Sequence, residues 1–406
     1  MLEDGAFVAA ALDAELRRHP QLDPRERALA TELSYGTLRT EPALRARLLV
    51  HAPRGVSDER VLAQLLVAAY QILLLERVPA FAAVDAAVNG VKRERGPRVA
   101  GFANAVLRKL AKTGEKLTQA QALREAVPAW LWQELERSFG EEQALALVAG
   151  EAYTGLRPRL GAELPDWLAE LPSGRVVTSA RLIRGAGDPR QKPGYTDGAF
   201  TVQEEGAQAI GLALGVRPGE RVLDACAGRG QKSTLLAERL GAGTLVACDL
   251  YPEKLAALSE EAQRLKLPEI TTRAVDWSVG QGSLLADFDR VLVDAPCSGT
   301  GTLRRRPEIL RRLGPEDPAR LGALAESILR SAASLAKPGA SVVFAVCSVL
   351  HAECEALVER VRDVLEPQPF VAPELPAELI AGKTSVRLLP GVHGTDGYFM
   401  ASFRRR

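Results

Sequence analysis

The sequence predicts a chain of several domains: an all-α bundle, a small α+β linking domain, and an α/β domain with a doubly wound parallel sheet. The chain has 406 residues, which is more than one hydrophobic core usually serves. Apolar side chains recur at helical spacing through residues 1–115, and strand-like runs alternate with helix-like stretches after Gly198. We therefore assign the bundle to residues 1–115, the linking domain to residues 118–195 and the α/β domain to residues 196–406.

Composition narrows the class of protein. Lys and Arg number 52 against 51 Asp and Glu, so any nucleic-acid contact must come from local basic patches. The five cysteines form no C-x-x-C pair and the four histidines are scattered, which predicts no metal site and a reduced, cytoplasmic protein. The first residues are acidic, unlike a signal peptide, and we expect no contact with a membrane.

The bundle is built from helices with recognisable ends. Asp23 and Pro24 are typical of an N-cap and a first helical turn. Residues 61–78 are the most apolar stretch, but their polar side chains favour a buried central helix over a membrane span. Two amphipathic stretches, 84–96 and 98–114, end in basic residues and glycine, as helices often do. The linking domain mixes two short helical patterns with a proline- and glycine-rich part that contains one strand-like run, GRVVTSARLI.

Five apolar strands are expected in the α/β domain: RVLDA, TLVACD, ITTRAV, RVLVDAP and SVVFAVCS. Helix-like stretches such as KSTLLAERLG separate them, and this alternation is typical of parallel βαβ units. Ligands of such sheets bind at the carboxyl ends of the strands. The chemistry is therefore expected where these strands end.

The first four strand ends predict a cofactor site. Residues 223–233, LDACAGRGQKS, form a glycine-containing turn that opens a helix, and this turn is neither a P-loop nor a dinucleotide fingerprint. The four strands finish in Asp224, Asp249, Asp276 and Asp294. Four converging carboxylates repel one another unless a cation or a hydroxyl-rich ligand lies among them. S-adenosylmethionine has ribose hydroxyls, an adenine amine and a cationic sulfonium, and it meets that need.

The fourth and fifth strand ends add two thiols, Cys297 and Cys347. A thiolate is a strong nucleophile, although most cysteines are small core residues. Two thiols at adjacent strand ends, one of them preceded by Asp-Ala-Pro, favour a catalytic role. We expect Cys226, Cys248 and Cys354 to be packing thiols, with Cys226 contributing only its backbone to the cofactor turn.

These motifs resemble those of known families. DAPCSGTG and FAVCS resemble the paired-cysteine motifs of the RNA 5-methylcytosine methyltransferases. GAFTVQEEGAQ resembles the segment that precedes their cofactor domain, and LLPGVHGTDGYFMASFRR resembles their closing strands. Near the N-terminus, SYGTLR, VNGVK and FANAVLRKL resemble the RNA-binding antitermination factor NusB. That domain order is characteristic of the bacterial 16S rRNA cytosine-5 methyltransferases, and it implies a NusB-like bundle followed by a Rossmann-like class I methyltransferase domain.

The resemblance implies a reaction and the residues for it. A methyl group would pass from S-adenosylmethionine to C5 of a cytosine in 16S rRNA. Cys347 would add to C6 of the base, Asp294 would hold the N3/N4 edge, and Cys297 would assist loss of the C5 proton. Contacts to the cofactor carry over to Cys226, Ala227, Gly228, Arg229, Gly230, Gln231, Lys232, Asp249, Asp276 and Asp294.

The chain departs from the family pattern at two places. AGRGQKS stands where the family usually has AAPGGKT, so Arg229 replaces a proline and Gln231 a glycine. LRPRL, residues 156–160, stands where family members tend to carry an Arg-Val-Asn stretch. The second departure bears on the path of the RNA through the linking domain.

Several alternatives remain open from the residues alone. The same reaction on tRNA, or a noncatalytic RNA-binding factor of ribosome assembly, would share this fold. The basic run 303–312 either contacts phosphates, which we favour, or forms a solvated helix face. Trp277 and Tyr251 either flank the adenine or simply pack. We expect a monomer whose partner is RNA, not DNA.

Overall fold

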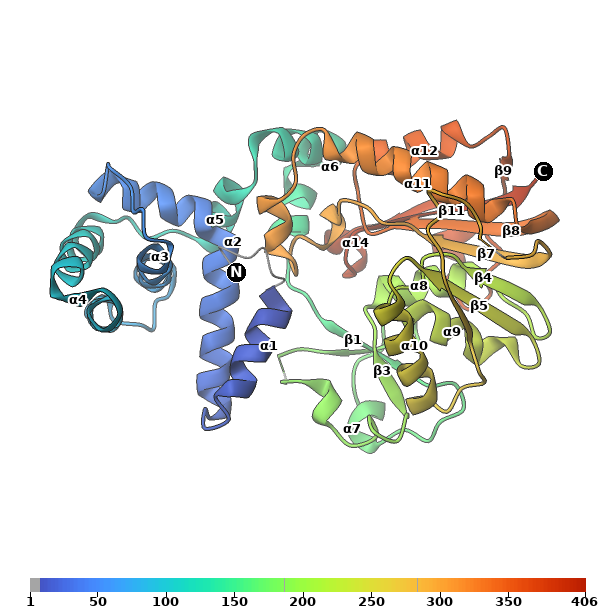
Figure 1. Cartoon of the computed structure of the whole chain (residues 1–406), viewed down its shortest axis with the longest axis horizontal. Coiled ribbons are helices and arrows are strands. Elements are labelled where there is room, and N and C mark those ends of the chain that lie inside the picture. The colour runs from blue at the N-terminus through green and yellow to red at the C-terminus, as the bar shows by residue number, and fades with distance from the viewer. Residues whose placement is uncertain (1–7, 186, 283) are drawn as a thin grey trace. The chain divides into compact units, whose positions relative to one another are not determined.

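The computed structural model describes residues 8–185, 187–282 and 284–406. The chain divides into two compact units (Figure 1). Unit 1 comprises Met1–Ala149 and Arg305–Arg312, and unit 2 comprises Gly150–Arg304 and Leu313–Arg406. The segment expected to link the domains contributes to both, because residues 118–149 belong to unit 1 and residues 150–195 belong to unit 2. The three domain boundaries stay a prediction.

Unit 1 is helical, as the sequence predicts. Its elements are α1 (Val8–Arg18), α2 (Pro24–His51), α3 (Glu59–Leu74), α4 (Ala80–Thr113), α5 (Gln119–Ala126), α6 (Ala129–Ala149) and the short 3-10 helix η3 (Pro307–Arg311). Asp23 caps α2, since its carboxylate accepts hydrogen bonds from the backbone of Arg25 and Glu26, which confirms the predicted start. The two predicted stretches 84–96 and 98–114 lie in α4, which kinks at Gly96.

The most apolar stretch lies at the centre of this unit. Helix α3 buries nine of its residues, and fully buried side chains such as Leu65, Leu66 and Tyr70 pack against α2 and α4. The prediction of a central core helix is therefore confirmed. Within the described residues, no helix is long and apolar enough to cross a membrane.

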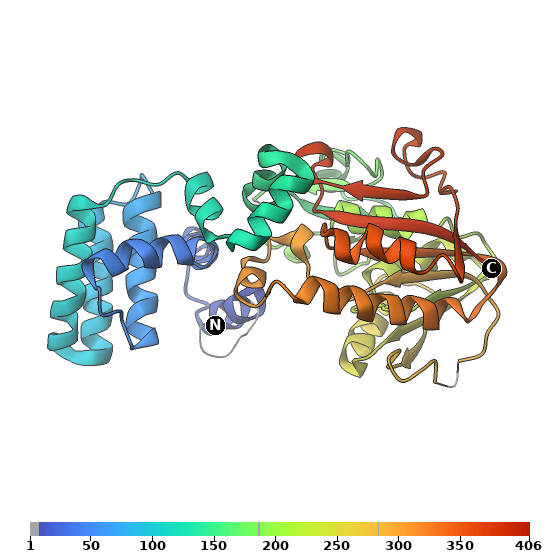
Figure 2. The same cartoon turned by 90° about the horizontal axis from the view of Figure 1, so that it is seen from above.

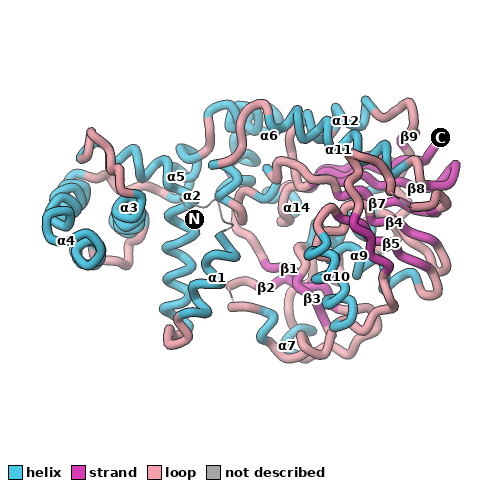
Figure 3. Tube along the Cα trace, in the orientation of Figure 1, coloured by secondary structure: helices cyan, strands magenta, loops and turns pink. Residues whose placement is uncertain are grey.

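Unit 2 contains two sheets, seen as magenta strands in Figure 3. The smaller sheet is antiparallel in the order β2-β1-β3, formed by β1 (Thr154–Pro158), β2 (Arg181–Ile183) and β3 (Phe200–Val202). The larger sheet has the order β10-β11-β8-β7-β4-β5-β6, and β9 pairs with β11. Its strands are β4 (Arg221–Asp224), β5 (Thr244–Asp249), β6 (Thr271–Ala274), β7 (Phe288–Asp294), β8 (Ala336–Val346), β9 (Leu365–Pro367), β10 (Ser385–Leu388) and β11 (Tyr398–Arg405).

The five predicted strands correspond to β4–β8 and are mutually parallel, as expected. The closing strands β9, β10 and β11 pair in antiparallel fashion. From β4 the chain proceeds outward through β5 and β6, and then returns to the other side of β4 with β7 and β8. The strand order thus reverses between β4 and β7, which is where an open α/β sheet opens its ligand crevice.

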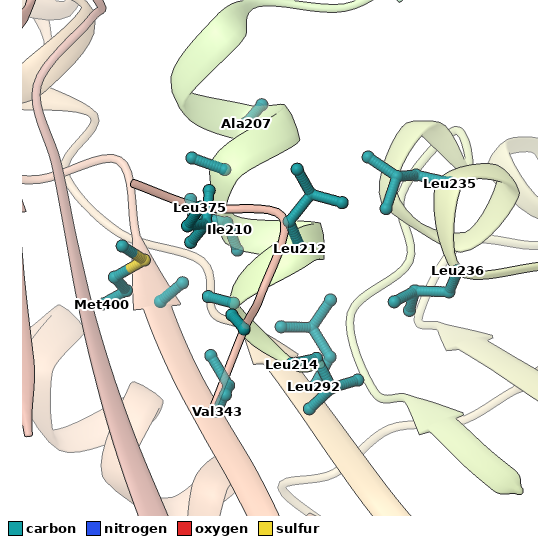
Figure 4. Close-up of a cluster of buried hydrophobic side chains, with 14 of the residues drawn as sticks. Ala207, Ile210, Leu212, Leu214, Leu235, Leu236, Leu292, Val343, Leu375 and Met400 are labelled. Carbon is teal, nitrogen blue, oxygen red and sulfur yellow. The ribbon is translucent and has the colours of Figure 1, made fainter. Parts of the chain in front are cut away.

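Helices cover both faces of this sheet (Figure 2). Along β8, Val343 and Ala345 join one core cluster, whereas Val342, Phe344 and Val346 join the other, as the two-residue period of a strand requires. The first cluster packs against α8 (Glu205–Ala213), α9 (Gln231–Leu240) and α10 (Pro252–Arg264), and part of it is drawn in Figure 4. The second packs against α11 (Asp317–Ala333) and α12 (Glu355–Arg360). The remaining short helices are α7 (Asp166–Ala169), η1 (Pro189–Gln191), η2 (Thr300–Thr302), η4 (His351–Glu353), α13 (Ala377–Ile380) and α14 (Pro390–His393).

Candidate active site

The predicted site residues gather at one edge of the large sheet. Asp224, Asp249 and Asp294 are the last residues of β4, β5 and β7, and Cys347 directly follows β8. These strands are neighbours and run parallel, so their carboxyl ends share an edge. Apolar runs long enough to cross the core, each followed by a polar residue, produce this arrangement from local sequence alone.

The two thiols lie side by side. The sulfur atoms of Cys297 and Cys347 are 3.3 Å apart, and either can donate its proton to the other. The hydrogen bond from Cys347, together with burial, raises the pKa of the Cys297 thiol well above its usual value. One of the pair can therefore be ionised only while the other keeps its proton.

The backbone fixes the Cys297 loop to the strand end that carries Cys347. The amide of Gly301 donates to the carbonyl of Cys347 (3.0 Å), and the amide of Gly397 donates to the carbonyl of Gly301 (2.8 Å). A Cβ atom at position 301 would lie 1.9 Å from the carbonyl oxygen of Gly397, so only glycine fits here. Gly301 in the GTG part of the motif thus allows the backbone of this loop to lie directly against the backbone at Gly397.

A buried lysine pairs with the carboxylate next to the thiols. Lys232 Nζ lies 2.6 Å from Asp294 Oδ2, with the lysine in the first turn of α9. Burial alone would lower the pKa of Lys232, but the attraction of Asp294 outweighs it and the pKa is raised. The pair joins the first turn of α9, the helix that follows β4, to the end of β7, and the strand order reverses between β4 and β7. It holds the Asp294 carboxylate in one orientation.

Asp224 lies behind this pair and is fully buried. Its Oδ2 accepts a hydrogen bond from Ser233 Oγ (2.7 Å), whereas its Oδ1 has no partner in the structure. Burial raises the pKa of Asp224 to about 6, although Ser233 and Lys232 oppose the shift.

The turn between β4 and α9 has the shape of a cofactor cradle. Gly230 takes a left-handed conformation (φ 83°), and a Cβ atom there would meet Leu258, whereas the space around Gly228 is open. The Asp249 carboxylate accepts backbone hydrogen bonds from Gly228 (2.9 Å) and Tyr251 (3.0 Å), one on each oxygen. Lys254 Nζ also lies 3.4 Å from Asp249 Oδ1. Oδ2 keeps a lone pair, so the carboxylate can still accept a ribose hydroxyl. These residues fit S-adenosylmethionine.

Other predicted contacts lie at the margin of this cradle. Asp276 is exposed, and hydrogen bonds from the side chain and backbone of Ser278 lower its pKa. Gln231 donates its side-chain amide to the carbonyl of Val202, and the Arg229 side chain is exposed. The two positions that depart from the family pattern thus leave the backbone of the turn intact.

The two aromatic residues have different environments. Trp277 is buried in the core and donates its indole N–H to the carbonyl of Ala225 (2.7 Å), so the packing interpretation is confirmed. Tyr251 is half-exposed, with the Lys254 ammonium 4.2 Å from its ring centroid. Tyr251 therefore remains available to a ligand.

One expectation about basic residues needs correction. Phosphate contact by the start of the run 303–312 is wrong for Arg304, which is buried and pairs with Asp396 (2.6 Å). The adjoining segment Arg305–Arg312 belongs to unit 1, where Arg311 lies 3.7 Å from Glu41. In the LRPRL stretch, Arg157 is also buried, because it forms an ion pair with Glu238 of α9. Neither arginine is free to bind RNA.

The remaining cysteines are packing residues. Cys248 and Cys354 are fully buried in the second core cluster, and burial raises the pKa of Cys248 to about 12. Cys226 packs against the same cluster, and its pKa is raised by burial. Within the described part of the chain, no group of three or more potential ligands could hold a metal ion.

Sequence reasoning missed the polar residues beneath the two thiols. Ser298, Ser348, Thr300 and Glu353 form a buried hydrogen-bonded network directly after the two cysteines. The signal was present, since each of the two cysteines is followed by serine, but nothing local pointed to Glu353.

Comparisons with known proteins match both units of the chain. The family model of the 16S rRNA methyltransferase RsmB/F matches residues 211–404, and the NusB family model matches residues 1–112. The "Probable ribosomal RNA small subunit methyltransferase B" of Bacillus subtilis is 31% identical over 100% of this chain and 96% of its own length. The "Ribosomal RNA small subunit methyltransferase B" of Vibrio cholerae is also 31% identical, over 94% of this chain and 90% of its own.

A solved structure shares the fold over nearly the whole chain. That of PH0851 superimposes with a TM-score of 0.81 at 22% sequence identity, covering 98% of this chain and 97% of that one. The order of a helical unit followed by a sheet-containing unit is thus found in an experimental structure.

Proposed function

Because the chain belongs to the family of the 16S rRNA methyltransferases RsmB/F, with a NusB segment ahead of the catalytic part, we propose that it transfers a methyl group from S-adenosylmethionine to C5 of a cytosine in small-subunit rRNA. The observation that carries this proposal is the pair of thiols 3.3 Å apart beside the Lys232–Asp294 pair. Such a pair suits a reaction in which one thiol must attack the base and a second must help to release it.

Cys347 is the nucleophile in this proposal. C5 of cytosine does not attack a methyl donor unaided, and addition of a thiolate at C6 gives it enamine character. While Cys347 is a thiolate, the neighbouring thiol of Cys297 stays protonated and donates a hydrogen bond to it. Asp294, held by Lys232, binds the N3/N4 edge of the base and polarises the ring as the S–C6 bond forms.

Release requires the second thiol. Cys297 gives its proton to solvent once Cys347 is consumed in the S–C6 bond, and it then takes the proton from the methylated C5. The C5–H electrons restore the C5=C6 bond, and the S–C6 bond breaks to return the Cys347 thiolate. The overall exchange releases one proton, which balances transfer of a methyl group from a sulfonium.

The cofactor would be held by the turn Cys226–Lys232 and by Asp249, with Asp276 at the margin and Asp294 toward the thiols. When bound, it supplies an electrophilic methyl group. The open space at Gly228 and the backbone amides at the start of α9 support this placement. Because small-subunit rRNA is the proposed substrate, we place the protein in the cytoplasm, where it acts as a single chain.

Two cysteine variants test the thiol roles. We expect Cys347→Ala to lower methyl transfer at least ~1,000-fold, since the variant lacks the thiolate that adds to C6, while cofactor affinity stays unchanged. We expect Cys297→Ala to accumulate a covalent protein–RNA adduct, visible on a denaturing gel, because addition proceeds and release does not. Normal turnover by the first variant would remove Cys347 from the mechanism. A Cys297→Ala protein that turns over slowly without an adduct would contradict the release role.

A further inference from the structure

A buried carboxylate lies beneath the two thiols and takes no part in the reaction. Glu353, at the end of η4, is 0% exposed. Its Oε1 accepts from the backbone amide of Ser298 (2.7 Å), and its Oε2 accepts from the hydroxyl of the same serine (2.6 Å) and from the hydroxyl of Ser348 (2.6 Å). One carboxylate therefore receives three hydrogen bonds.

The donors come from two different strand ends. Ser298 directly follows Cys297 in the loop after β7, and Ser348 directly follows Cys347 after β8. The hydroxyl of Thr300 lies 3.2 Å from that of Ser298 and 3.1 Å from that of Ser348, and it closes the network. Glu353 thus ties together the backbone positions that follow the two thiols.

A carboxylate is the chemical group that this network demands. Each serine hydroxyl has a single proton and spends it on Oε2, and the Ser298 amide spends its proton on Oε1. A carboxylate accepts all three. A carboxamide would set an N–H donor against one of these donors, so Gln cannot reproduce the arrangement. Burial raises the pKa of Glu353, whereas the hydrogen bonds from Ser298 and Ser348 lower it. Burying a charged group costs free energy, and an apolar side chain at this position would avoid that cost.

We infer that Glu353 is a positioning residue that sets the spacing of Cys297 and Cys347 by clamping the serine after each of them. This inference rests on the proposed two-thiol function and goes beyond it by naming the group that aligns the thiols. Because Glu353 is fully buried, it acts through the two serines and not through contact with the substrate. The step most sensitive to it is release, which needs both sulfurs at one base.

The first readout is kinetic. Glu353→Gln is expected to lower kcat at least ~10-fold and to raise the fraction of protein trapped as the RNA adduct, because Cys347 still adds but Cys297 is displaced. The KM for the cofactor should change less than ~2-fold. The matched control is Glu359→Gln, the same chemical change on the exposed side of α12, where Glu359 pairs only with Arg362 in the described structure.

The second readout measures thiol spacing without any methyl transfer. Hydrogen peroxide takes two electrons and two protons from the Cys297 and Cys347 thiols, forms a disulfide, and is reduced to two waters. Peptide mapping by mass spectrometry follows this one crosslink and separates it from products of the other three cysteines. We expect the wild type and Glu359→Gln to form the disulfide at the same rate, and Glu353→Gln to form it at least ~10-fold more slowly.

A second variant tests the same network in case Glu353→Gln does not fold. Ser348→Ala removes one of the three donors and leaves the carboxylate with the two from Ser298, so a smaller decrease of ~3-fold in the crosslinking rate is expected. Unchanged crosslinking in Ser348→Ala, or in a folded Glu353→Gln, would overturn the positioning role. A different outcome separates the two proposals. If the wild-type protein transfers no methyl group and Glu353→Gln still forms the disulfide more slowly than wild type, the proposed function is overturned and the positioning role stands.

Discussion

Three aspartates at the ends of neighbouring strands have three different environments. Asp224, Asp249 and Asp294 were predictable, because each follows an apolar run that can only be a buried strand. Their different environments were not predictable. Asp294 forms an ion pair with a lysine, and Asp249 accepts hydrogen bonds from two backbone amides. Asp224 has one carboxylate oxygen without a hydrogen-bond partner. These differences depend on α9 and on loops from distant parts of the chain.

Asp224 has a pH-dependent effect on stability. Its pKa in the folded protein is about 6, above the ordinary value of 3.8. The folded protein therefore holds an extra proton between these values, and the contribution of Asp224 to stability falls as pH rises through this window. The free energy of unfolding of Asp224→Asn, measured relative to that of wild type, should therefore increase by about 2 kcal/mol when the pH is raised from about 4.5 to about 8.

Chemical denaturation of both proteins at the two pH values measures this difference. Ser233→Ala, which removes the hydrogen bond but keeps the charge, serves as the control and should widen the pH dependence. A free-energy difference between Asp224→Asn and wild type that is independent of pH would show that Asp224 is not the buried acid described here.

At the scale of elements, alternation of strands and helices was readable because each βαβ unit is local in sequence. The position of β11 was not, since it pairs with β8 on one side and with β9 and β10 on the other. That pairing decides the position of Gly397, which holds the loop of Cys297 through Gly301. Glu353 was missed for the same reason, because its partners lie at two strand ends.

Gly301→Ala tests this contact between elements. The added Cβ would lie 1.9 Å from the Gly397 carbonyl oxygen, so the loop must move away from Cys347. We expect a loss of about 2–4 kcal/mol in the free energy of unfolding and at least a ~10-fold loss of methyl transfer. Gly314→Ala is the control, since its nearest neighbour would be a flexible glutamate side chain 3.5 Å away. Equal behaviour of the two variants would contradict the close approach.

At the scale of the whole molecule, each unit has its own hydrophobic core. The sequence predicted a helical part and an α/β part, yet it did not predict that Arg305–Arg312 belongs to unit 1. The basic composition of this segment does not predict the contact between η3 and α2, because solvated helices and segments packed against another helix can have the same composition.

Calorimetry with and without cofactor separates the two units. S-adenosylmethionine is proposed to bind unit 2 alone, so at about 100 times its Kd it should stabilise that unit by about 2.7 kcal/mol. The transition of unit 2 should move to higher temperature while that of unit 1 stays in place. Asp249→Ala should reduce the shift. A cofactor-dependent rise in the transition of unit 1 would contradict the assignment.

The most direct test of the central claim is transfer of a labelled methyl group to total RNA that lacks this modification, followed by digestion to nucleosides. Wild-type protein should place the label in 5-methylcytidine of small-subunit rRNA, and Cys347→Ala should place none. Label in tRNA would keep the chemistry and overturn the substrate. Label in any nucleoside other than 5-methylcytidine, or no transfer by a wild-type protein that still binds the cofactor, would contradict the account.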